Sequence, residues 1–352
     1  MTERRRGRTV TGIKEVAELS GLSTATVSRA LGGRGSVSAK SRKLAQDAAA
    51  QLGFVPSYAA SSLASGRHHN IGVVVPAVNR WFFASVVDGA SSELIEAGYD
   101  LTLYTTSQNE SHRATVLTDF LLRKRLDAVI AVSLELAEAE ISQLMAIHRP
   151  VLGIGGPLPG ADSIFVDDFQ LARKATEHLI GLGHRRIAHL SAGHEYEADF
   201  KLPGTRRNGY EMAMQAANLP ISAEWVQTSD FTVQGAYATA RQLLGSGPLR
   251  PTAIFAASDE MAIGTILAAR DFGLRVPDEL SVIGIDGHEL GSVFGLTSFD
   301  QDPRGQGALA ARKILGRLEQ PLQLQESSHV PVAEEYPTRL VVRTSTAVPP
   351  VD

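Results

Sequence analysis

Near the start of the chain, short hydroxyl side chains and one arginine share the exposed face of a predicted helix. They are Thr24, Thr26, Ser28 and Arg29, and the methyl group of Ala25 shares the same face. Hydroxyl groups make single hydrogen bonds, whereas a guanidinium can donate two parallel bonds to a phosphate or to the edge of a guanine. These residue types therefore indicate binding to a polar surface.

Two helical patterns joined by a Gly-Leu-Ser turn position this face within residues 13–31, IKEVAELSGLSTATVSRAL. Gly21 is typical of a left-handed helix C-cap, and Ser23 is placed to cap the second helix. The apolar positions are Ile13, Val16, Ala17 and Leu19 in the first helix and Val27, Ala30 and Leu31 in the second. The pattern predicts a helix-turn-helix whose second helix fits the major groove of DNA, or else an ordinary helical hairpin in a core.

Charge favours the first of these alternatives. The first 70 residues hold eleven Lys or Arg and four acidic residues, a net charge of +7, whereas the remaining 282 residues carry a net charge of −11. A basic head on an acidic body suggests that the head alone meets a polyanion. A solvated terminus explains the arginines at positions 4–8, but not the basic residues within the helical patterns.

Two further segments belong to this head. Ser38 can cap a third helix, with Leu44, Ala48 and Leu52 on its inner face and Gly53 at its end. A serine-rich stretch follows from Ser57 to Ser65. A helix of about nine residues is marginal alone in water, so we expect this stretch to be ordered by a partner or to serve as a flexible linker.

Composition limits the classes of protein that remain. The 352 residues suggest two or three domains, and a 43% hydrophobic content is ample for large cores. The absence of cysteine excludes disulfides and thiol chemistry. No apolar run approaches the length of a membrane span, and no apolar segment follows the basic N-terminus as in a signal peptide. We therefore expect a cytoplasmic protein with no membrane partner.

The body alternates strand and helix patterns in two successive arrays. The strands of the first are IGVVVPAV, YDLTLYTT, DAVIAV and PVLGIG, and after Asp167 those of the second are RIAHLSA, WVQTSD, TAIFAAS and LSVIGID. Helical patterns lie between them, at about 83–98, 111–122, 169–182 and 203–217, and then up to Leu244 and Phe272. The alternation predicts two Rossmann-like lobes with parallel sheets and a ligand cleft between them.

Two other classes of function compete with DNA binding. An enzyme would need a motif, but the chain has no GxSxG, no P-loop and no GxGxxG that opens a helix after a strand. Asp167 and Asp168 are adjacent carboxylates that fit a lobe crossover better than an acid–base pair. His178, His184 and His189 fit structure better than a metal site, so we expect neither metal nor cofactor. A binding protein without a DNA role is the second alternative.

Long strings of the sequence resemble the LacI/GalR family of bacterial transcription regulators. They are the opening run, VSAKSRK, LGFVP, SSLASGR, IGVVVP, EHLIGLGHRRIAHL, PTAIFAASDEMAIG, LRVPDELSVIGID and PTRLVVRTS, within about residues 11–345. The resemblance implies an N-terminal all-α helix-turn-helix head on an α/β body whose two Rossmann-like lobes resemble periplasmic binding proteins.

The resemblance also implies domain boundaries. A basic tail covers 1–10, the DNA-binding domain 11–56, a hinge helix and linker 57–69, the effector-binding and dimerisation domain 70–345, and a tail 346–352. The N-lobe would comprise about 70–167 and 300–330, and the C-lobe about 168–299 and 331–345.

The resemblance assigns DNA contacts to the head and the hinge. Thr24, Ala25 and Arg29 fall on positions that read bases, and Ser23, Thr26 and Ser28 suit phosphates. In the hinge, Leu63 matches the leucine that wedges open the central base step in the minor groove, and Ala60 a small contact beside it. A homodimer, a pseudo-palindromic operator and, most commonly, repression are implied.

Positional matches also place a small-molecule effector, sugar-like in most of the family, between the lobes. Its implied contacts are Asn79, Trp81, Phe82, Phe83, Arg206, Phe231, Ser258 and Asp286. Ser258 replaces a frequent Asn, and Asp259 fits a helix N-cap. Gly155-Gly156 stands where many sugar-responsive members carry Asp-Arg. This departure argues against an ordinary hexose and leaves open a larger, anionic or modified ligand.

Overall fold

The structure is a computed structural model that describes residues 12–32, 37–54, 67–106, 110–123, 125–193, 201–245, 250–320 and 330–350. The chain divides into two compact units, Met1–His69 and Asn70–Asp352. The expected hinge contacts Ala60 and Leu63 lie outside the described residues. Among the residues that are described, no helix is both long and apolar enough to cross a membrane.

The first unit contains the three predicted helices, α1 (Ile13–Ser20), α2 (Thr24–Leu31) and α3 (Ala39–Leu52). Their predicted caps are confirmed. Gly21 and Gly53 end α1 and α3 in the left-handed conformation, with φ of 67° and 61°. The Oγ atoms of Ser23 and Ser38 accept hydrogen bonds from the backbone amides of the third residues of α2 and α3, at 3.2 and 3.1 Å.

Small side chains form the core of this head. The buried residues are Val16, Ala17, Val27, Ala30, Ala45, Ala48 and Ala49. Two expected core positions are wrong, because Leu19 is 46% exposed and Leu44 is 41% exposed. The inner stripe of α3 follows alanines spaced three and four residues apart. Alanines at these positions allow the three helices to approach closely, and this turns Leu44 outward.

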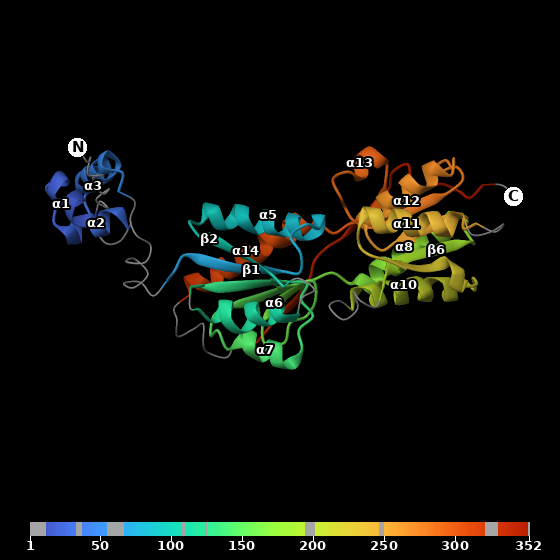
Figure 1. Ribbon diagram of the computed structural model, residues 1–352, viewed down its shortest axis with the longest axis horizontal. Helices are drawn as coiled ribbons and strands as arrows, with labels where there is room; N and C mark the ends of the chain where they lie inside the picture. Colours follow the sequence, from blue (N-terminus) through green and yellow to red (C-terminus); the bar gives the residue numbers. More distant parts are fainter. Residues whose placement is uncertain are drawn as a thin grey trace, which may run out of the picture. The chain divides into compact units, whose positions relative to one another are not determined.

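The N-lobe of the body is a six-stranded sheet with helices on both faces (Figure 1). In spatial order its strands are β11 (Ala333–Glu335), β5 (Asp162–Phe165), β4 (Val151–Ile154), β3 (Ala128–Val132), β1 (Asn70–Val75) and β2 (Asp100–Thr105), all parallel. Helices α5 (Trp81–Glu96) and α14 (Pro303–Glu319) cover one face. The other face carries α6 (Glu110–Thr115), a π-helical turn (Val116–Phe120), a 3-10 turn (Leu121–Arg123) and α7 (Glu138–Met145).

The C-lobe repeats this three-layer plan (Figure 1). Its strand order is β12 (Arg339–Val341), β10 (Thr297–Asp300), β9 (Ser281–Asp286), β8 (Ala253–Ala256), β6 (Ile187–Ala192) and β7 (Val226–Ser229). Only the β10–β12 pair is antiparallel. Helices α11 (Val233–Gly245) and α12 (Asp259–Asp271) pack on one face, and α8 (Asp168–Gly181) and α10 (Leu202–Ala216) on the other. A 3-10 turn (Ala223–Trp225) precedes β7, and the short α13 (Gly291–Phe294) precedes β10.

The predicted fold class of two parallel lobes is therefore confirmed, with corrections near the crossings between them. The strand pattern missed β5, β10, β11 and β12, which are only three or four residues long. Because β11 pairs with β5, residues 333–335 belong to the N-lobe sheet. The final C-lobe segment therefore begins after them and not at 331.

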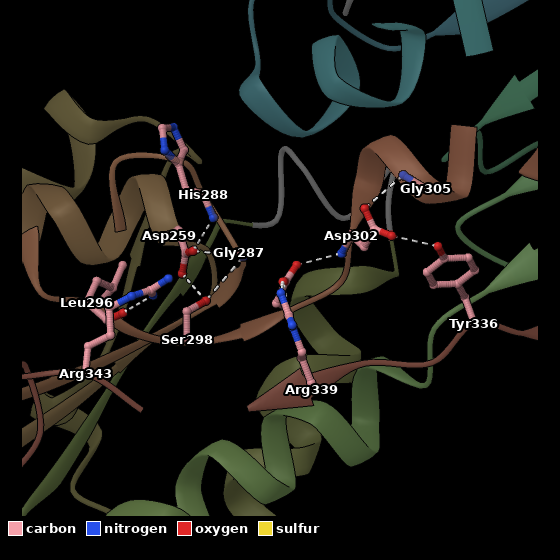
Figure 2. Close-up of polar contacts among 11 residues, drawn as sticks. Asp259, Gly287, His288, Leu296, Ser298, Asp302, Gly305, Tyr336, Arg339 and Arg343 are labelled. Carbon is pink, nitrogen blue, oxygen red and sulfur yellow. Dashed lines mark hydrogen bonds and ion pairs between the residues drawn. The ribbon is translucent and has the colours of Figure 1, made fainter. Parts of the chain in front are cut away.

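Polar contacts tie together two segments in which the chain crosses between the lobes, residues 300–305 and 336–339 (Figure 2). Tyr336, which follows β11, donates a 2.8 Å hydrogen bond to Oδ2 of Asp302, the residue before α14. Oδ1 of Asp302 caps α14 by accepting from the backbone amide of Gly305 at 2.9 Å. The guanidinium of Arg339 in β12 bonds to Asp300 in β10 at 2.8 Å. These bonds fix where the chain passes from one lobe to the other.

Candidate functional site

The exposed face of α2 carries the residues predicted to contact DNA. Thr24, Ala25, Ser28 and Arg29 are exposed, whereas Thr26 is half-buried. Two hydroxyls are engaged locally, because Oγ of Ser23 lies 2.8 Å from Oγ1 of Thr26 besides capping the helix. Nε of Arg29 donates to the carbonyl of Ala25 at 3.2 Å, so this side chain lies along its own helix.

A cavity of about 1040 Å³ separates the two lobes. It opens beyond the carboxyl ends of β1, β3, β4 and β9, where ligands bind in such sheets. Seven predicted effector contacts line it, namely Asn79, Phe82, Phe83, Arg206, Phe231, Ser258 and Asp286. These seven residues therefore line one cavity although they are spread over more than half of the chain.

Trp81 is placed differently from its neighbours. It does not line this cavity but stacks on the ring of His288, with ring centroids 4.5 Å apart, beside a second hollow of about 500 Å³. Because α5 begins at Trp81 and successive helical side chains point about 100° apart, Trp81 and the phenylalanines after it face different surroundings. The structure thus places Trp81 in a contact between the lobes and outside the lining of the cavity.

Arg206 is held in place by a carboxylate at the start of α8. Its Nε and Nη2 atoms donate to Oδ1 of Asp168 at 2.8 and 2.6 Å, and Nη1 donates to the carbonyl of Ala257. The Arg206 side chain is only 3% exposed. Burial raises the pKa of Asp168, and the Arg206 guanidinium opposes that rise. Asp167 caps α8 through the amide of Gln170 at 2.9 Å, so the two adjacent carboxylates have separate structural partners.

Asp286 ends β9 in a backbone conformation that side chains rarely adopt, with φ of 138°. Its Oδ1 accepts a 2.8 Å hydrogen bond from Nε2 of Gln301, which lies at the crossing into α14. Burial raises the pKa of Asp286 well above its usual value; nearby Arg206 opposes the rise and Asp259 adds to it. The sequence analysis missed Gln301 because no local pattern links it to Asp286.

The expected N-cap at Asp259 is wrong. Ser258 caps α12 instead, accepting a 3.3 Å hydrogen bond from the amide of Met261. The Asp259 carboxylate is fully buried and holds the loop after β9 (Figure 2). It accepts from the amides of Gly287 and His288 at 2.9 and 2.7 Å and from Oγ of Ser298 at 2.7 Å. Burial raises the pKa of Asp259 to about 6, although the three hydrogen-bond donors favour the ionised form and oppose the rise.

Other contacts bridge the lobes around the cavity. Nη1 of Arg80, just before α5, donates to the carbonyl of Phe231 at 3.1 Å. Nζ of Lys201 lies 2.7 Å from Oε1 of Glu135, and both residues line the cavity. Together with the Trp81–His288 stack, these contacts set the separation of the lobes in this structure.

The three histidines take part in the packing of the C-lobe, as expected. Nε2 of His178 bonds to Thr346, and His184 bonds to Thr252 and Ser281. His189 stacks between Tyr210 and Phe255. In the part of the chain that the structure describes, no three histidine, aspartate or glutamate side chains gather as metal ligands.

Comparison with known proteins finds one family model over the head and another over the later part of the body. Residues 12–57 match the family model "Bacterial regulatory proteins, lacI family", and residues 176–346 match "Periplasmic binding protein-like domain". The transcriptional repressor PurR of Glaesserella parasuis is 32% identical over 337 residues, 95% of this chain and 97% of its own. The ribose operon repressor of Escherichia coli K12 is 33% identical over 92% of this chain and 98% of its own. The Lac repressor dimer bound to operator and the anti-inducer ONPF aligns with a TM-score of 0.81 at 26% identity, over 96% of this chain and 99% of that one.

Proposed function

Because the chain belongs to the LacI family of bacterial regulatory proteins, we propose that it is a repressor that binds a pseudo-palindromic operator as a homodimer and responds to a small molecule held between its lobes. One observation carries this proposal. A capped helix-turn-helix with an exposed recognition face precedes a body whose interlobe cavity gathers Arg206, Asp286 and three phenylalanines. Two copies of the head would read two half-sites.

In the DNA complex, the exposed face of α2 enters the major groove. Arg29 leaves the Ala25 carbonyl and donates to a guanine, while Thr24 and Ala25 make short contacts to neighbouring bases. Ser23 and Ser28 lie near phosphates, and the helix N-terminus favours that negative charge. Because this face has one long side chain, the hinge supplies further specificity through Leu63 and Ala60, a proposal that the sequence alone supports.

In the body, Arg206 and Asp286 are the polar anchors of the effector. Their bonds to Asp168 and Gln301 hold them in place before the ligand arrives, which lowers the entropic cost of binding. Phe82, Phe83 and Phe231 offer ring faces to the apolar side of a sugar-like molecule. Effector binding shifts the lobe arrangement and, through it, operator affinity.

We also propose that the chain has no enzymatic activity and acts in the cytoplasm, where bacterial DNA lies. The relatives named above are repressors. Three carboxylates of the body already have structural partners: Asp168 accepts from Arg206, Asp259 from the amide of His288, and Asp286 from Gln301. We therefore assign them a positioning role and not an acid–base role.

The test is operator selection from randomised palindromic duplexes, followed by fluorescence anisotropy at several salt concentrations. Arg29→Ala should weaken binding to the selected duplex by roughly 10- to 100-fold, relaxing preference at one base pair. Arg42→Ala, an exposed arginine on α3, is the matched control and should weaken selected and random duplexes alike. The proposal fails if no duplex is enriched, or if binding is insensitive to salt.

A further inference from the structure

The two sides of the interlobe cavity differ in chemistry. On the C-lobe side, Arg206 and Asp286 present polar groups that protein bonds already orient. On the N-lobe side the lining includes Leu134, Leu136 and Ile141. These three pack on the N-lobe core and remain half-buried, so part of each apolar surface is left uncovered.

The loop after β4 extends this apolar wall and leaves space in front of it. Pro157 and Pro159 are exposed and line the cavity. Gly155 has a φ of 99°, and a Cβ atom there would lie 2.5 Å from Oγ of Ser133, so this position excludes a side chain. Gly156 has no such restriction, and a Cβ atom would meet no heavy atom within 4 Å. The cavity is therefore open in front of Gly156, where no side chain fills it.

Charge around the cavity disfavours an anionic ligand. Within the described lining, every lysine or arginine is already bonded, Arg80 to the Phe231 carbonyl, Arg113 to Glu140, Lys201 to Glu135 and Arg206 to Asp168. The lining carboxylates are Glu135, Asp167, Asp168, Glu260 and Asp286. Three of the four cations are paired with a carboxylate, and the five lining carboxylates outnumber the four cations, so an anion would enter a lining of net negative charge.

The volume of the cavity points the same way. At about 1040 Å³ it lies just above the range for pockets that hold drug-sized ligands, roughly 300–1,000 Å³. A single sugar ring occupies only part of such a volume, so a ligand that fills the cavity also contacts the wall of Leu134, Leu136 and Ile141. We propose that the effector is an uncharged glycoside whose apolar aglycone lies against this wall in front of Gly156. This inference rests on the proposed function, in which the cavity is the effector site.

The experiment compares matched ligands on the full chain by isothermal titration calorimetry. The ligands are methyl and 4-nitrophenyl glycosides of glucose, galactose, mannose, xylose and ribose in both anomeric forms, with adenosine, inosine and glucose 6-phosphate. For each sugar that binds, we expect the aryl glycoside to bind about tenfold tighter than the methyl glycoside, because its ring buries more apolar area. The same ligand should shift operator affinity.

Two variants test the location of the aglycone. Gly156→Arg fills the space before the apolar wall and should reduce the advantage of the aryl over the methyl glycoside to less than about threefold. Gly181→Arg is the matched control, because Gly181 lies exposed on α8, outside the lining, and a Cβ atom there also meets nothing within 4 Å. Leu136→Asn should weaken the aryl glycosides without filling the cavity. Circular dichroism melts confirm that each variant folds.

Several results would overturn the inference while leaving the proposed function standing. They are equal affinity for methyl and aryl glycosides, tighter binding of glucose 6-phosphate or a nucleoside, an aryl advantage that survives Gly156→Arg, or binding of no member of the panel. Operator selection is measured without any ligand. If it enriches no duplex, the proposed function is refuted independently of the ligand measurements.

Discussion

The buried pair of Arg206 and Asp168 offers the sharpest test of how the cavity is built. Arg206→Met removes the guanidinium and leaves a carboxylate that is 13% exposed without its partner. Losing one member of a buried ion pair costs about 3–5 kcal/mol. The matched control is Arg207→Met on the same helix, since Arg207 is 47% exposed and pairs with Glu211 one turn away. An exposed pair of this kind contributes about 0.3–0.5 kcal/mol.

The stability that Arg206→Met loses should increase as the pH rises. Burial already raises the pKa of Asp168, and removal of the opposing Arg206 charge raises it further. The pKa of an aspartate in the unfolded chain is about 3.9. Between that pH and a higher folded pKa, the carboxyl is protonated in the folded state and ionised in the unfolded chain. Stability therefore falls as pH rises from the unfolded pKa to the folded pKa. The variant should lose more stability at pH 8 than at pH 5.

Urea unfolding followed by Trp225 fluorescence measures this effect. Trp225 packs against the C-lobe core, and Trp81→Phe makes it the sole tryptophan of the chain. Asp168→Asn added to Arg206→Met should restore most of the lost free energy of unfolding, because no buried charge remains. Equal losses at pH 5 and pH 8, or no recovery in the double variant, would refute the account of the pair.

Four further outcomes are expected. Ser23→Ala removes the cap of α2 and should destabilise the head by about 1 kcal/mol, seen as a lower melting temperature and weaker operator binding; an unchanged melt would contradict the capping role. His189 is fully buried and its pKa is lowered to about 4, so stability that is present above the unfolded pKa of about 6.5 is lost as pH falls toward 4, by about 3 kcal/mol. His189→Gln should flatten that loss in urea titrations between pH 4 and 7, and an unaltered slope would exclude His189 as its source. Leu63→Ala should weaken operator binding far more than non-specific binding, and equal losses would argue against a wedge. Asp286→Ala should leave operator affinity intact and blunt the effector response, which anisotropy with and without ligand can check.

Much of the fold was predictable because its signals are local. The caps at Gly21, Ser23 and Gly53 depend on single residues, and the long buried strands appear as apolar runs. The short strands β5, β10, β11 and β12 were missed because three or four residues carry little periodicity and their pairing partners are distant. The exposed Leu44 shows the same limit, since the closeness of helix packing decides which of two adjacent positions is buried.

The sequence by itself determined the architecture and the general place of both sites. Helical and strand periodicity, the +7 head and long family-like strings led to a DNA-reading head and a two-lobed body, and seven of the eight expected effector contacts line one cavity. Only the tertiary structure decided how those groups are held. It paired Arg206 with Asp168, joined Gln301 to Asp286, and turned Trp81 away onto His288. The physical reason is that periodicity and caps act over one or two turns of chain, whereas these partners meet only where sheet order and lobe crossings bring distant segments together.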